Sequence, residues 1–92
     1  MKISVICVTY KDAKLIKYLI KSFEKFKPEH FQIQYVIVEN SNDTKYKESV
    51  TSIADDVVYL NVPYGEKFNT LNGKSALGHG MAYEEGKKYL KY

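Results

Sequence analysis

The sequence predicts an α/β fold, a Rossmann-like open parallel sheet with helices on both faces, built as a single domain over residues 1–92. Three observations predict it. The run from Ile3 to Val8 is almost continuously apolar and β-branched, as in a central strand that is covered on both faces. A helical pattern of apolar residues follows it. Strand and helix patterns then alternate to the end of the chain, which requires right-handed crossovers between parallel strands.

The first half of the chain contains two strands and one long helix. After the strand at 3–8, Asp12 is the expected N-cap of a helix, and Pro28 ends that helix. Its inner face carries apolar residues three and four positions apart, namely Leu15, Ile16, Leu19, Ile20, Phe23 and Phe26. The second strand runs from Ile33 to Glu39 and has an apolar centre.

The second half repeats this alternation with shorter elements. A polar turn at 40–43 leads into a short helix, for which Tyr46, Val50 and Ile53 supply the inner face and Asp55-Asp56 the break. Residues 57–62 form a third strand, and the polar segment 63–73 is the longest loop. A third helix runs from about residue 75 to 85, with Gly86 as its left-handed C-cap residue, and 89–92 begin a fourth strand.

Composition excludes several classes of protein. Apolar residues make up 45% of the chain and charged residues 27%, which is typical of a globular domain. All 14 basic residues are lysines scattered among acidic residues, so nucleic acid is not an expected partner. The single cysteine, Cys7, is expected to be a small buried residue of the fold. A chain with one cysteine also fits a reducing compartment. No segment has the roughly 20 apolar residues of a membrane span, so we expect a cytoplasmic protein without membrane association.

The predicted topology directs attention to the carboxyl ends of the strands, where open α/β sheets bind ligands. Thr9 and Tyr10 follow the first strand, and Tyr10 can either stack on a planar base, worth roughly 1 to 3 kcal/mol, or pack on the first helix. Glu39 and Asn40 end the second strand and can either bind a base and ribose or cap the next turn.

The segment that begins at Gly73 has a lysine and a serine at a helix start, where backbone N–H groups and the helix dipole favour a diphosphate. Lys74 is the candidate diphosphate contact, although Gly73 can equally be a structural hinge. The glycine spacing of a phosphate loop is absent. His79 has no partner at metal-ligand spacing and is expected to be structural or exposed to solvent. The sequence shows no complete catalytic set.

Three segments resemble the family 2 glycosyltransferases. Residues 4–11 (SVICVTYK) are similar to the family's S-V-I-I-P-T-Y-N strand, and 36–43 (VIVENSND) to its V-V-D-N-G-S-T-D segment. Residues 73–81 (GKSALGHGM) are similar to its G-K-S-A-L-N-x-G-I segment. The resemblance covers nearly the whole chain. It implies a GT-A fold, a nucleotide-diphosphate-sugar donor and transfer of the sugar to an acceptor hydroxyl.

The resemblance also implies roles for individual residues. Tyr10 would stack on the base with Thr9 close by, Glu39 would contact the base or ribose with support from Asn40, and Lys74 would lie near the diphosphate. Residues 86–92 resemble the strand that leads into the family's D-x-D motif, and the sequence ends there. A full-length relative would bind Mg²⁺ or Mn²⁺ through that motif. We therefore expect no cofactor in this chain and little or no transferase activity from it alone.

A second interpretation is a small flavodoxin-like interaction or regulatory domain that binds no nucleotide. In that case Tyr10 and Glu39 are ordinary surface residues. If the chain is truncated, a fourth strand without continuation would expose a sheet edge and apolar surface that the missing half would cover. We therefore expect either a homo-oligomer or association with a missing C-terminal half.

Overall fold

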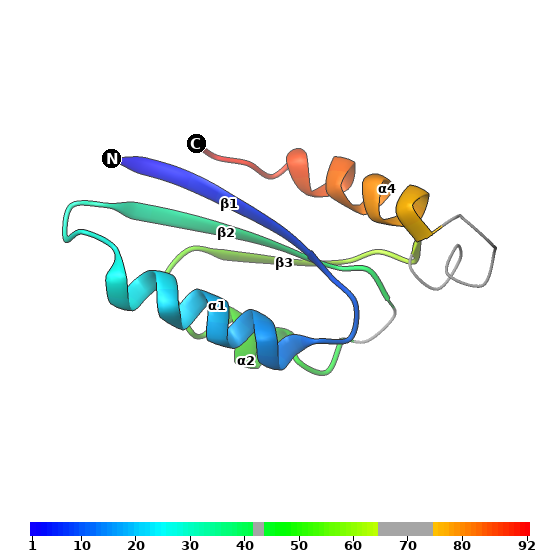
Figure 1. Ribbon diagram of the computed structural model, residues 1–92, viewed down its shortest axis with the longest axis horizontal. Coiled ribbons are helices and arrows are strands. Elements are labelled where there is room, and N and C mark those ends of the chain that lie inside the picture. Colours follow the sequence, from blue (N-terminus) through cyan, green and yellow to red (C-terminus); the bar gives the residue numbers. More distant parts are fainter. Residues whose placement is uncertain (42–43, 65–74) are drawn as a thin grey trace.

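The computed structural model describes residues 1–41, 44–64 and 75–92. Its elements are β1 (Lys2–Thr9), α1 (Ala13–Phe26), β2 (Gln32–Glu39), α2 (Lys47–Thr51), β3 (Val57–Asn61) and α4 (Ser75–Lys87). The strands form a parallel sheet in the order β1-β2-β3. Helices α1 and α2 lie on one side of this sheet and α4 lies on the other (Figure 1). The predicted parallel α/β sheet with helices on both faces is confirmed, and it is compatible with a Rossmann-like fold.

Two expectations about the sheet are wrong. The described sheet has β2 at its centre and β1 at one edge, because β1 pairs only with β2 whereas β2 pairs with both neighbours. Burial agrees, since β2 is buried from Ile33 to Glu39 and most of β1 is only half-buried. Residues 89–92 form no strand.

The limits of α1 follow from the residues that flank it. The Asp12 side chain accepts a hydrogen bond from the backbone N–H of Leu15, so it caps the helix as predicted. At the other end Lys27 is extended, with φ −65° and ψ 147°. Pro28 imposes this conformation because its ring disfavours a helical residue before it. The predicted start and end of this helix are therefore confirmed.

The short helix α2 differs from its prediction. It ends at Thr51, before Asp55-Asp56, and Tyr46 precedes its first turn as an exposed residue outside the core. Val50 is fully buried in the core, and Ile53 packs against that core from beyond the helix. Five residues make barely more than one turn, so tertiary packing through Val50 holds this helix.

The core has two layers, because successive side chains of a strand point to opposite faces. The layer beneath α1 and α2 joins Ile16 and Ile20 of α1 to Tyr35 and Ile37 of β2. The layer beneath α4 joins Val36 and Val38 to Ala82. Strand β2 thus supplies both layers, which explains its nearly continuous apolar sequence.

Tyr35 is the largest fully buried side chain, and its polar end is satisfied. Its hydroxyl donates a 2.8 Å hydrogen bond to Glu24 Oε2, and its ring contacts Phe23 in a tilted arrangement. Burial raises the pKa of Tyr35 above its ordinary value of 10.0, and the neighbouring Glu24 raises it further. The phenol therefore stays neutral and anchors α1 to β2.

Gly86 is not the C-cap of the last helix, as α4 continues to Lys87. It is buried where α4 crosses the sheet. A Cβ atom on Gly86 would lie 2.6 Å from Ile6 Cδ1 and 2.7 Å from Val38 Cγ2. The close approach of α4 to the sheet thus requires a glycine at this position. The sequence pattern does not reveal this contact between distant segments.

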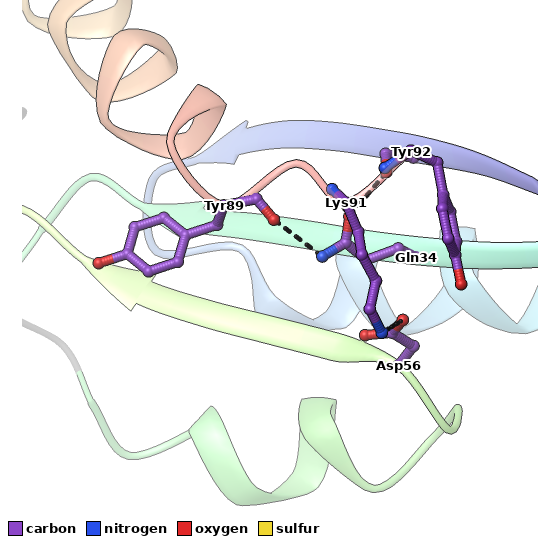
Figure 2. Close-up of polar contacts among 6 residues, drawn as sticks. Gln34, Asp56, Tyr89, Lys91 and Tyr92 are labelled. Carbon is purple, nitrogen blue, oxygen red and sulfur yellow. Dashed lines mark hydrogen bonds and ion pairs between the residues drawn. The ribbon is translucent and has the colours of Figure 1, made fainter.

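Beyond α4 the chain continues toward the amino-terminal ends of the strands and lies against the sheet (Figure 1). Figure 2 shows the side chain of Gln34 beside this tail. Gln34 Nε2 donates to the carbonyl of Tyr89 at 2.9 Å, and Gln34 Oε1 accepts from the backbone N–H of Lys91 at 2.8 Å. Lys91 Nζ also lies 2.9 Å from Asp56 Oδ2. Side-chain bonds therefore hold the segment that was expected to be a strand.

Two exposed ion pairs lie at the end of α4. Ion pairs three residues apart join Lys87 to Glu84 and Lys88 to Glu85, and pairs of this exposed kind add little to stability.

None of the described helices combines the length and the apolar character needed to cross a membrane.

Candidate functional site

Three predicted site residues meet at the carboxyl ends of β1 and β2. The parallel register sets Thr9 beside Glu39, and the backbone N–H of Asn40 donates to the carbonyl of Thr9 at 2.7 Å. All three residues are buried. The two strands thus continue to pair past their last ladder residue, so this end of the sheet is a rigid platform beneath the loop that follows β1.

The Glu39 carboxylate is used by the chain itself. Its oxygens accept from the backbone N–H of Lys11 at 2.9 and 3.2 Å, and from Ser41 Oγ at 2.8 Å. Glu39 is only 1% exposed. Its hydrogen bonds to the chain are therefore made in a site that water does not reach. In this arrangement the carboxylate positions the connection from β1 to α1.

Lys11 has a φ of 55°, the only positive value among the described non-glycine residues. A left-handed lysine is unfavourable by itself, so the bond from its N–H to Glu39 offsets the cost. Ser41 escaped the sequence reasoning although its side chain is fully buried. The sequence nevertheless contains an indication of this role, because a hydroxyl two residues after a strand-ending carboxylate is well placed to donate a hydrogen bond to that carboxylate.

Tyr10 lies in this fixed connection, and 41% of its surface is exposed. Lys11 Nζ lies 5.2 Å from the centroid of its ring, within the range of a cation–π contact. The ring is therefore accessible next to a positive charge, at the end of the sheet that topology selects for ligands. Whether it stacks on a base stays a prediction.

Asn40 links this platform to α4. Its side-chain Nδ2 donates to the carbonyl of Gly78 at 3.2 Å. On the other side, Asn61 Nδ2 donates to the carbonyl of Ser41 at 3.3 Å. The residues after β2 are thus tied both to the last helix and to β3. Lys74, predicted to lie near a diphosphate, falls outside the described residues.

A basic pocket of about 350 Å³ lies at the start of α1. Its lining residues are Lys11, Asp12, Ala13, Lys14, Lys17 and Tyr46. Three lysines against one aspartate give it a positive charge, and the amino-terminal end of α1 adds its partial positive charge. The sequence pattern did not indicate it, because Tyr46 precedes α2 and only the fold brings it beside the start of α1.

Groups suited to nucleophilic or metal chemistry lie elsewhere or apart. Cys7 packs against the core beneath α1, and burial raises the pKa of its thiol above 9.0, so little of it is thiolate at neutral pH. His79 is exposed, as expected. In residues 1–41, 44–64 and 75–92, no three His, Cys, Asp or Glu side chains are grouped closely enough to hold a metal ion.

Comparison with known proteins adds no relative to this description. No family model matches the chain, and no curated protein or solved structure matches it significantly. The likeness to family 2 glycosyltransferases therefore remains a likeness of three short sequence segments.

Proposed function

We propose that this chain binds a nucleotide-diphosphate sugar, as the nucleotide-binding part of a glycosyltransferase-like protein that transfers the sugar to an acceptor hydroxyl. One observation carries the proposal. Tyr10 is exposed on a connection that Glu39 holds in a left-handed conformation at Lys11. An exposed aromatic ring on a backbone that is hydrogen-bonded in place, at the carboxyl ends of parallel strands, suits the recognition of a planar base.

The basic pocket supports the same function. A nucleoside diphosphate carries its negative charge close to the base, and the pocket begins at Lys11, the residue after Tyr10. In the proposed complex the base stacks on Tyr10, while Lys11, Lys14 and Lys17 attract the diphosphate. Lys74 is a further proposed contact. Thr9, Glu39 and Asn40 are buried, so they contribute mainly by holding the platform beneath the ligand.

A specific observation favours a second candidate, an interaction domain without nucleotide. A wide apolar groove lies along α1 and is lined by Leu15, Tyr18, Phe23 and Phe26, all exposed. Exposed apolar patches of this kind mark protein contacts. The groove and the Tyr10 connection lie on different parts of the molecule, so one protein can have both activities.

Calorimetric titration with uridine, guanosine, thymidine and cytidine diphosphates tests the first candidate. We expect one of them to bind saturably and Tyr10→Ala to weaken that binding about tenfold or more, since stacking is worth roughly 1 to 3 kcal/mol. The matched control is Tyr83→Ala, because Tyr83 on α4 is also 41% exposed. It should bind like the wild type.

Two results would count against nucleotide binding. The first is the absence of heat with all four diphosphates, which would leave the interaction domain as the better explanation. The second is equal weakening by Tyr10→Ala and Tyr83→Ala, which would indicate a general loss of structure. Circular dichroism of both variants separates the latter case from a local effect.

A further inference from the structure

The open edge of β1 and the apolar groove along α1 lie next to each other. Within the described residues, β1 pairs only with β2, and no backbone group from Ile3 to Val8 has a backbone hydrogen bond outside that ladder. Alternate N–H and C=O groups of β1 therefore point to the open side, where an edge strand is a template for another strand.

The groove has a volume of about 620 Å³ and begins on β1 itself, at Ile3. Most of its wall comes from one flank of α1, including Leu15, Tyr18, Leu19 and Phe26. Tyr18 is 71% exposed and Phe26 77% exposed. Such exposure is unusual for aromatic side chains that lie together on one helix flank, because each leaves a large apolar area in water.

The lining of this groove contains almost no charged side chains. Lys27 is the one charged residue among those that line it, and it is paired with Glu24 at 3.1 Å. At about 100° per residue, the lysines at 14, 17, 21 and 25 lie on the other flank of α1. Lys14 and Lys17 there line the basic pocket with Tyr46, which precedes α2. The apolar flank is thus the one turned away from α2.

We propose that a second copy of this chain covers both features, with the β1 strands paired antiparallel across a two-fold axis to form a continuous six-stranded sheet. A second copy is the occupant that supplies a matching strand edge and a matching apolar flank at once. An interface of this kind uses the same surface patch on both copies. The groove and the edge then become one interface.

The directions in which the β1 side chains point are consistent with this antiparallel pairing. Ile3, Val5 and Cys7 face the α1 layer, whereas Ile6 and Val8 face the α4 layer. A two-fold axis perpendicular to the sheet, midway between the two β1 strands and level with Val5, keeps these faces together because it pairs residues that face the same layer. Ile3 then lies opposite Cys7 of the second copy. The same operation sets the two α1 flanks side by side, so aromatic side chains from both copies fill the groove.

Size indicates how strong such a dimer would be. The eight residues of β1 span about 26 Å, and the strand and helix layers together are about 20 Å deep. This gives about 500 Å² per copy, or about 1,000 Å² in total, which is the lower limit for a specific interface. We therefore expect a reversible dimer that dissociates on dilution, with a dissociation constant in the micromolar range.

Sedimentation equilibrium from about 1 μM to 1 mM tests this proposal. The wild type should pass from monomer to dimer, and Tyr18→Glu and Phe26→Glu should each raise the dissociation constant about tenfold or more. Tyr83→Glu is the control, as it places the same charge on the exposed surface of α4 and should leave the dimer unchanged. Nucleotide binding by Tyr18→Glu should be normal, which separates this proposal from the proposed function.

Hydrogen exchange tests the strand pairing independently of the helices. Alternate amides between Ile3 and Val8 should exchange slowly in the dimer and faster in Tyr18→Glu at the same concentration. A wild type that stays monomeric to 1 mM would overturn the proposal and leave the groove to another partner. A dimer that persists in both glutamate variants, or one whose β1 amides are unprotected, would overturn it as well.

Discussion

At the scale of single residues, Glu39 shows how one carboxylate can suit two interpretations. A strand-ending acid followed by asparagine has the donors and acceptors of a nucleoside clamp. In the structure its oxygens accept from Lys11 and Ser41 of the same chain. The bond to Lys11 crosses from β2 to the connection after β1, so Glu39 determines the position of Tyr10 from below.

Replacement of Glu39 measures this positioning role. Glu39→Ala removes the buried carboxylate that accepts from the Lys11 N–H and the Ser41 hydroxyl, which should lower the free energy of unfolding by about 2–4 kcal/mol. Urea denaturation measures the change. Glu84→Ala is the control, since the Glu84 side chain is 68% exposed, and it should change stability by less than about 0.5 kcal/mol. Equal effects would show that the Glu39 bonds contribute nothing measurable.

At the scale of elements, α4 depends on a glycine for its contact with the sheet. Gly86 is buried against Ile6 of β1 and Val38 of β2, whereas Gly80 of the same helix has no atom within 4 Å of a built Cβ. Glycine weakens a helix by its flexibility wherever it occurs. Of these two glycines, Gly86 is the one that close packing explains.

These two glycines form a matched pair of substitutions. Gly80→Ala should raise the free energy of unfolding by up to about 1 kcal/mol, because alanine is the better helix former and meets no neighbour. Gly86→Ala should lower it by about 1–3 kcal/mol, because the new methyl group overpacks the interface with β1 and β2. Urea denaturation of both variants checks the opposite signs. Stabilisation by both would mean that α4 does not approach the sheet closely.

At the scale of the whole molecule, the last residues of the chain are joined to its beginning. The backbone N–H of Tyr92 donates to Ser4 Oγ at 3.0 Å, and Ser4 Oγ donates to Gln34 Oε1 at 2.6 Å. Gln34 in turn holds Tyr89 and Lys91 (Figure 2). One buried amide thus connects β1, β2 and the tail after α4.

Loss of that amide should release the tail without unfolding the domain. In Gln34→Ala we expect the amides of Lys91 and Tyr92 to exchange about tenfold faster or more, since removal of the acceptor costs about 1–3 kcal/mol. Hydrogen exchange followed by mass spectrometry measures this. Gln32→Ala is the control, because Gln32 is an exposed residue at the start of the same strand. Unchanged exchange in Gln34→Ala would show that other contacts hold the tail.

The sequence by itself determined the elements that depend on local chemistry. Periodicity and caps predicted the Asp12 start and the Pro28 end of α1, and the apolar runs predicted all three strands of the described sheet. The alternation of strands and helices predicted a parallel sheet covered on both faces. It also predicted that Thr9, Glu39 and Asn40 would come together, because parallel strands end at the same edge.

Only the tertiary structure decided which strand lies at the edge, what Gly86 is for and how Glu39 uses its oxygens. Each of these depends on contacts between segments far apart in the chain, such as Gly86 against Val38 or Glu39 against Lys11. The tail at 89–92 has the composition of a strand, yet Gln34 holds it by side-chain bonds. Local patterns carry propensity, whereas hydrogen-bond partners and close packing are set by the fold as a whole.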